Sequence, residues 1–84
     1  MDILRHRIGV LICRQHSLGS YGLVLDAFRM ANQLGAGHQF DLVRISQDGL
    51  PVPHPDGLMS VDAGLSALGE MDAVLIPSLW LNGP

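Results

Sequence analysis

The chain has 84 residues, 48% of them hydrophobic, and its formal net charge is −3. A chain of this length is one domain at most, and its negative charge argues against nucleic-acid binding, which requires a basic stripe. The single cysteine excludes an internal disulfide and a cysteine-based metal cluster. The hydrophobic content is high for so small a body. Either the chain is a fragment of a larger domain, or it buries its surplus apolar surface against a partner.

The first half of the chain predicts a strand followed by a helix. Residues 8–13 are a continuous apolar run, which is typical of a parallel strand that is covered on both faces. Apolar side chains then recur at helical spacing, which predicts a helix over residues 20–34. Ser20 is the expected N-cap and Ser17 the alternative, while Gly35 ends the helix.

The second half predicts two further strands with a hairpin and a short helix between them. Residues 40–45 form the second expected strand, and the prolines within residues 50–61 favour an edge hairpin with arms at 52–54 and 58–61. Asp62 is the expected cap of a short helix over residues 62–68. Residues 72–77 are the final strand, expected to be buried. The order β-α-β-(β-β)-α-β predicts a parallel sheet with crossover helices.

Four segments, in this order and at this spacing, resemble the opening of a known domain: Arg7–Ile12, Leu23–Asn32, Phe40–Gly49 and Asp72–Pro77. They resemble the N-terminal part of the class I glutamine amidotransferase-like (ThiJ/PfpI) domain. Within that superfamily they are most similar to the sensor domain of AraC-type transcriptional regulators. The resemblance implies that residues 1–84 are the N-terminal portion of such a domain, with no second domain. The implied fold is a partial doubly wound, flavodoxin-like parallel sheet that lacks its second half.

The resemblance also implies that the chain is not an enzyme. The nucleophile elbow of the superfamily lies beyond the matched part, as does the helix-turn-helix domain of the regulators. Hydrolytic members carry an acidic residue just before the first helix, and that position falls on Ser20, which cannot hold a proton as a carboxylic acid does. The glycine pair that often follows the last strand is replaced here by Ser78 and Leu79.

Three functions therefore compete. The expected function is a truncated ligand-sensing and oligomerisation domain of an AraC-type regulator. One alternative is the N-terminal fragment of a ThiJ/PfpI-type amidase, protease-like or deglycase-like enzyme. The other is a stand-alone interaction module that dimerises through a sheet edge and Trp80.

The candidate ligand-binding residues are expected at the carboxyl edge of the sheet, where α/β folds bind their ligands. Ser17, Ser20 and Tyr21 surround the expected start of the first helix, whose unpaired N–H groups favour anions. Ser78 and Leu79 follow the last strand. The expected partners are a small-molecule effector and a second copy of the chain, without DNA contact by this segment.

The cysteine and the histidines indicate neither a catalytic site nor a metal site. Cys13 and His16 supply at most two metal ligands, fewer than a zinc site requires, so we expect no metal and no cofactor. Cys13 is expected to be a small buried hydrophobe, and His6, His16, His38 and His54 are expected to be solvated loop residues. No apolar stretch approaches the length of a membrane span or a signal-peptide core. We therefore expect a soluble, cytoplasmic chain without membrane contact.

Overall fold

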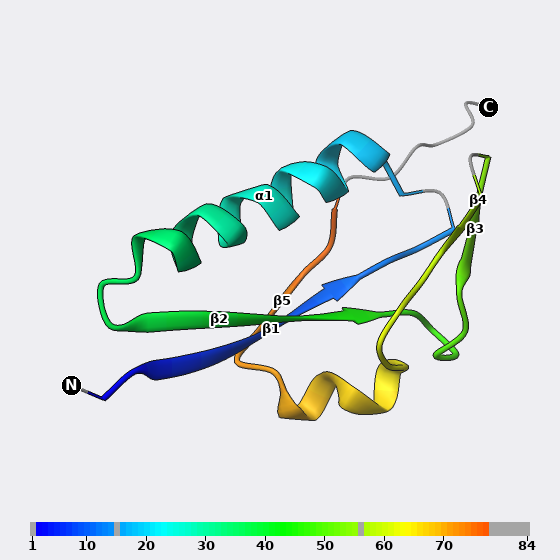
Figure 1. The fold of residues 1–84 in the computed structure, drawn as a ribbon. Helices are drawn as coiled ribbons and strands as arrows, with labels where there is room; N and C mark the ends of the chain where they lie inside the picture. The colour runs from blue at the N-terminus through cyan, green and yellow to red at the C-terminus, as the bar shows by residue number, and fades with distance from the viewer. Residues whose placement is uncertain (1, 15, 56, 78–84) are drawn as a thin grey trace.

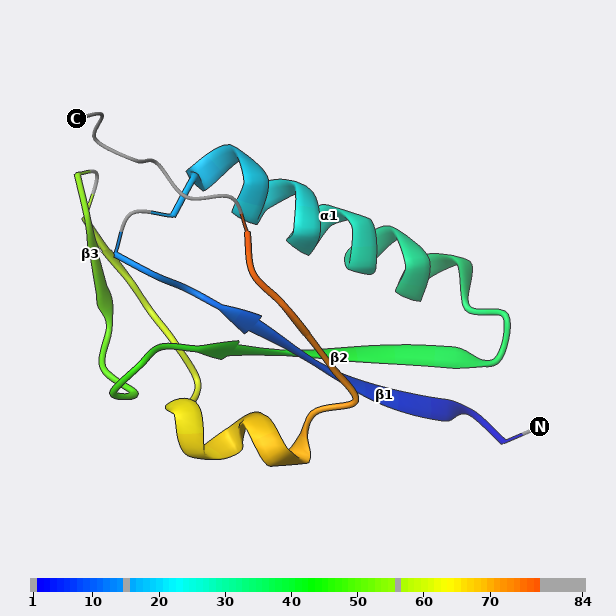
Figure 2. The ribbon, with the colours of Figure 1, turned by 180° about the vertical axis from the view of Figure 1, so that it is seen from behind.

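The computed structural model describes residues 2–14, 16–55 and 57–77. The described part is a small α/β structure with a three-stranded parallel sheet in the order β2-β1-β5. Its strands are β1 (Leu4–Leu11), β2 (His38–Ile45) and β5 (Ala73–Leu75). Helix α1 (Leu18–Leu34) covers one face of this sheet, and the 3₁₀ helix η1 (Leu65–Glu70) lies on the other face (Figures 1 and 2).

The central strand β1 pairs with both neighbours in parallel. Its register with β2 runs from Leu4↔His38 to Leu11↔Ile45, and Ile8 pairs with Ala73 of β5. The parallel relation between the first and last strands, expected from their continuous apolar runs, is therefore confirmed. The expected burial of β5 is wrong. Val74 is exposed because β5 pairs with β1 alone within the described residues.

Helix α1 begins earlier than its apolar periodicity predicts. Ser17 has an extended backbone, and its Oγ accepts a hydrogen bond from the Ser20 N–H at 3.3 Å. Ser17 is therefore the N-cap, and the preferred assignment of this role to Ser20 is wrong. The helix ends as expected at Gly35, whose positive φ of 73° favours glycine and whose N–H donates to the Ala31 carbonyl.

Two side chains cover the outer edge of β2, and the sequence predicts neither role. The Asn32 carboxamide donates from Nδ2 to the Phe40 carbonyl at 2.9 Å and accepts from the Phe40 N–H at 2.7 Å, as a neighbouring strand would. Further along the same edge, the Asp62 carboxylate accepts from the Arg44 N–H at 2.8 Å. The expected cap by Asp62 is wrong, because η1 is preceded by Gly64 and has no side-chain cap.

The hairpin forms, but not as an edge of the main sheet. Strands β3 (Val52–His54) and β4 (Gly57–Met59) pair with each other in a separate antiparallel sheet. Beyond β4, Ala63 forms a parallel bridge to Ile45 of β2. The hairpin closes a core over the N-terminal end of α1, formed by Ile12, Tyr21 and Val52. This core fixes the loops at the carboxyl ends of β1 and β2.

Candidate functional site

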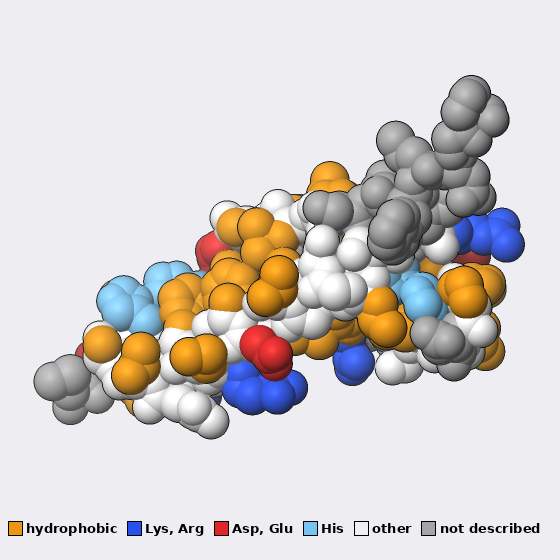
Figure 3. Space-filling view, turned by 90° about the horizontal axis from the view of Figure 1, so that it is seen from above, with side chains coloured by type: hydrophobic (Ala, Val, Ile, Leu, Met, Phe, Trp, Pro, Cys, Tyr) orange, Lys and Arg blue, Asp and Glu red, His pale blue; other side chains and the backbone are white. Residues whose placement is uncertain are grey.

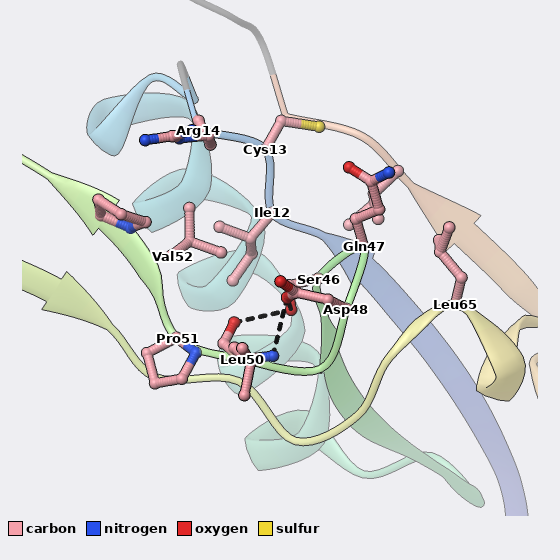
Figure 4. Close-up of a pocket in the computed structure, with 12 residues that line it drawn as sticks. Ile12, Cys13, Arg14, Ser46, Gln47, Asp48, Leu50, Pro51, Val52 and Leu65 are labelled. Carbon is pink, nitrogen blue, oxygen red and sulfur yellow. Dashed lines mark hydrogen bonds between the residues drawn. The ribbon is translucent and has the colours of Figure 1, made fainter.

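A cavity of about 600 Å³ lies where the carboxyl ends of β1 and β2 face the hairpin (Figure 4). This volume lies within the usual range for small-molecule sites. The walls come from the end of β1, the β2–β3 loop, β3 and the start of η1. The lining residues are Leu11, Ile12, Cys13, Arg14, Ser46, Gln47, Asp48, Leu50, Pro51, Val52, Pro53 and Leu65.

The β2–β3 loop holds its shape through its own hydrogen bonds. Ser46, which is buried, donates from Oγ to the Leu50 carbonyl at 2.8 Å, and Asp48 Oδ1 accepts from the Leu50 N–H at 3.0 Å. Asp48 therefore acts as a turn residue whose carboxylate binds its own backbone two residues on. Because Oδ1 already accepts that hydrogen bond, the Asp48 carboxylate is less available to a ligand than an unbound carboxylate would be.

The polar groups that remain available at the cavity are Arg14, Gln47 and the Cys13 thiol. The other arginines (Arg5, Arg7, Arg29 and Arg44) each pair with a carboxylate. Arg14 has no such partner among the described residues. Figure 4 shows Arg14 on the side of Val52 and Gln47 on the opposite side, toward Leu65. Cys13 lies between them and is half-buried, not buried as expected.

The wall formed by Leu65 is held in place by an ion pair on the neighbouring chain segment. Arg44 Nη2 lies 3.2 Å from Asp62 Oδ1, and the backbone N–H groups of Asp62 and Ala63 both donate to the Arg44 carbonyl. The hydrogen bonds from Arg44 lower the pKa of Asp62 below its usual value. The same interaction raises the pKa of Arg44. Both side chains are partly exposed, so solvent weakens the pair.

His16 is the clearest departure from the expected solvated histidines. Its side chain is only 1% exposed, its ring lies against Tyr21 and His54, and its Nδ1 lies 2.8 Å from the Cys13 carbonyl. Because a carbonyl only accepts, His16 Nδ1 carries a proton and donates to the Cys13 carbonyl. Nε2 is buried, with no hydrogen-bond partner among the described residues. His16 therefore orients the loop after β1 and does not contact the Cys13 thiol through Nε2.

His6 and His38 lie in strands, not in loops as expected. His6 Nε2 and His38 Nδ1 are 2.8 Å apart on β1 and β2, and the His6 ring also stacks on Phe40. His54 likewise belongs to β3. Within the described ranges, no group of three or more histidine, cysteine or acidic side chains is arranged to hold a metal ion.

The predicted site residues lie beside the cavity, and none of the described ones lines it. Ser17 caps α1 and Ser20 donates its N–H to that cap. Tyr21 is buried in the core, and its N–H donates to the Ser17 carbonyl, so it is not a free anion donor. Ser78 and Leu79 lie outside the described residues, as does Trp80. Ligand binding by these residues stays a prediction. The cavity-lining loop was missed, although its Ser46–Leu50 turn carries a recognisable turn signal.

None of the helices in the described ranges is long and apolar enough to cross a bilayer. No family model matches the chain, and no curated protein sequence does.

Among solved structures, the chain is similar to an AraC family transcriptional regulator from Pseudomonas putida. The two share 28% sequence identity and superpose with a TM-score of 0.72 over 94% of this chain and 49% of the regulator. The chain thus spans about half the length of that regulator. In both sequence and fold, it is similar to part of an AraC family transcriptional regulator.

Proposed function

We propose that the chain is a ligand-sensing portion of an AraC-type transcriptional regulator, built on a class I glutamine amidotransferase-like (ThiJ/PfpI) scaffold. The similarity to the Pseudomonas regulator supports the family. The observation that carries the sensing role is the cavity at the carboxyl ends of β1 and β2. Open α/β sheets bind their ligands at this edge.

The lining favours a small organic acid as the effector. Most of the wall is apolar and suits a hydrocarbon body, as at Ile12, Leu50 and Val52. The rim carries the Arg14 guanidinium, which no carboxylate of the described residues neutralises. Arginine binds carboxylates through paired hydrogen bonds. A ligand with an apolar chain and one terminal carboxylate matches both features.

The same geometry supports a role in binding without catalysis. Among the described residues the Cys13 thiol has no hydrogen-bonded general base, because His16 Nε2 has no hydrogen-bond partner there. Ser20 stands where hydrolytic members of the superfamily carry an acid, and it only donates its backbone N–H to Ser17. The cavity therefore offers shape and charge for recognition, with no activated nucleophile among the described residues.

Calorimetric titration with two probes of equal length and opposite charge tests this assignment. Hexanoate should bind more tightly than hexylammonium, and Arg14→Gln should abolish the preference, whereas Arg29→Gln on α1 should preserve it. Leu50→Trp, which fills the cavity mouth, should weaken hexanoate binding at least about tenfold. Leu58→Trp is the matched control, since Leu58 is similarly exposed on β4 and lies outside the lining. Equal binding of both probes, or equal damage by the two tryptophans, would overturn the assignment.

A further inference from the structure

The outer edge of β2 leaves one backbone position open. The N–H and the carbonyl of Phe40 both bind the Asn32 side chain. Four residues further on, the Arg44 N–H binds the Asp62 carboxylate. Both strand residues thus turn their backbone groups away from β1, and Leu42, midway between them, does the same because this direction alternates along a strand. Within the described residues no partner binds the N–H or the carbonyl of Leu42, so this position is open to a ligand.

A hollow of about 620 Å³ lies beside this open position. Its walls include Leu25 and Arg29 of α1, Leu42 and Val43 of β2, and Ala67 of η1. Because α1 and η1 lie on opposite faces of the sheet (Figure 1), the hollow extends the plane of the sheet beyond β2. A flat molecule in this plane therefore meets the Leu42 backbone with its edge. We refer to the hollow and the Leu42 backbone together as the β2-edge site.

The Asn32 side chain shows which chemical group satisfies such a backbone position. Its carboxamide accepts from the Phe40 N–H at 2.7 Å and donates to the Phe40 carbonyl at 2.9 Å, so one planar group binds both. A free carboxamide beside Leu42 makes the same pair of hydrogen bonds. A carboxylate lacks the donor and sets an oxygen against the Leu42 carbonyl. The open position is therefore complementary to an amide and not to an acid.

The charges around the β2-edge site are paired. Each of its three arginines lies within 3.6 Å of a carboxylate, and the pairs are Arg7 with Glu70, Arg29 with Asp26, and Arg44 with Asp62. Figure 3, which looks down on α1, shows an acidic and a basic side chain next to each other beside hydrophobic ones. An anionic ligand has to compete with these carboxylates for the arginines, so the site favours a neutral ligand.

The two covered positions limit the size of the ligand. Phe40 and Arg44 are four residues apart, which is about 13 Å along the strand. A peptide that adds a strand to a sheet requires a row of open backbone groups. Asn32 and Asp62 occupy the next position on either side of Leu42. One amide group therefore fits between them, whereas an extended peptide has to displace them.

We propose that the β2-edge site binds a small neutral molecule that carries a free carboxamide on a flat apolar body. The carboxamide oxygen accepts from the Leu42 N–H, and its NH₂ group donates to the Leu42 carbonyl. The body lies in the hollow, where Leu25, Val43 and Ala67 supply apolar surface. The site shares no lining residue with the cavity at the carboxyl ends of β1 and β2, so this proposal does not rest on the effector proposed for that cavity.

Titration of the isotopically labelled 84-residue chain with three related probes tests the hydrogen-bond pattern. Benzamide carries both the donor and the acceptor, benzoate is charged and lacks the donor, and N,N-dimethylbenzamide is neutral and lacks the donor. Benzamide should give saturable amide shifts at Leu42, Val43 and Ala67, and the other two probes should bind there at least about tenfold more weakly. Equal binding of the three probes at these amides would overturn the proposal, as would benzamide shifts confined to the cavity at the carboxyl ends of β1 and β2. Hexanoate reports on that cavity separately.

Hydrogen exchange at the Leu42 N–H tests the contact itself. In the free chain this N–H should exchange faster than the Phe40 N–H, which the Asn32 carboxamide binds. Benzamide at about ten times its Kd should slow the exchange at Leu42 about tenfold. Unchanged exchange at Leu42 in saturating benzamide would contradict the proposal.

Two variants and a peptide test the shape of the site. Ala67→Phe fills the hollow from η1 and should weaken benzamide binding at least about tenfold. Ala27→Phe is the matched control, since Ala27 is exposed on α1 outside the lining, and it should leave binding unchanged. Equal weakening by the two folded variants, checked by circular dichroism, would argue against the site. A blocked trivaline peptide that binds at Leu42 more tightly than benzamide would show that the edge accepts a strand, and would overturn the proposal. If Ala67→Phe does not fold, the exchange measurement on the wild-type chain decides.

Discussion

Asn32 should be a main stabilising residue of α1, because its half-buried side chain binds the edge of β2. Its carboxamide makes two hydrogen bonds to the Phe40 backbone, at 2.9 Å and 2.7 Å. A hydrogen bond of this kind contributes about 1 kcal/mol net, so Asn32→Ala should lower the free energy of unfolding by about 2 kcal/mol. In urea, with a slope of about 1 kcal/mol per molar, the midpoint should fall by about 2 M.

The matched variants make this prediction specific. Gln33→Ala changes the adjacent exposed residue, and its free energy of unfolding should stay within about 0.5 kcal/mol of the wild type. Asn32→Asp keeps the acceptor for the Phe40 N–H but sets a carboxylate oxygen against the Phe40 carbonyl. It should be destabilised at neutral pH and recover in acid, where the protonated carboxyl group donates again. Equal stability of Asn32→Ala and Gln33→Ala in urea melts followed by circular dichroism would refute the reasoning.

Three further outcomes are expected. Because Arg44 lowers the pKa of Asp62, this carboxylate stabilises the fold above its unfolded pKa of about 4, and the contribution is lost as the pH falls through the lower folded value. Asp62→Asn should thus lower the free energy of unfolding by about 0.5 kcal/mol at neutral pH and leave it unchanged in strong acid. Urea melts at several pH values measure this difference, and a difference that does not change with pH would contradict the reasoning. Gly9→Ala places a Cβ 3.0 Å from Met71 Cγ and should lower the free energy of unfolding by about 1–3 kcal/mol. Gly22→Ala has open space around its Cβ and should stabilise the helix. A higher melting temperature for Gly9→Ala than for Gly22→Ala would be incompatible with this packing. In gel-shift assays the chain should not bind DNA specifically at physiological salt, since its net charge is −3; a sequence-specific shift would count against this.

The order of elements was accessible from the sequence because each segment has one dominant local signal. Continuous apolar runs predict covered parallel strands, and two of the three strands follow from them directly. The turn after α1 follows from Gly35, whose positive φ few other residues adopt. The start of α1 was less accessible. Both Ser17 and Ser20 are good caps, and Leu18, the first helical residue, is exposed and adds no apolar periodicity.

The parts that sequence reasoning missed depend on contacts between distant segments. His16 is buried because the hairpin brings His54 against its ring, which no local pattern encodes. Asp62 binds the edge of β2 instead of capping η1, because Arg44 presents both an N–H and a guanidinium there. The cavity likewise arises from four segments, whereas the prediction considered only a helix start and the end of the last strand.

Chemical-shift mapping with hexanoate on the isotopically labelled chain tests the central claim of ligand sensing most directly. The account predicts saturable shifts at the amides of Cys13, Arg14, Gln47 and Val52, which line the cavity. Amides on the exposed side of α1, such as that of Met30, should not move with the ligand. Shifts confined to residues outside the cavity, or no saturable shift at all, would contradict the account.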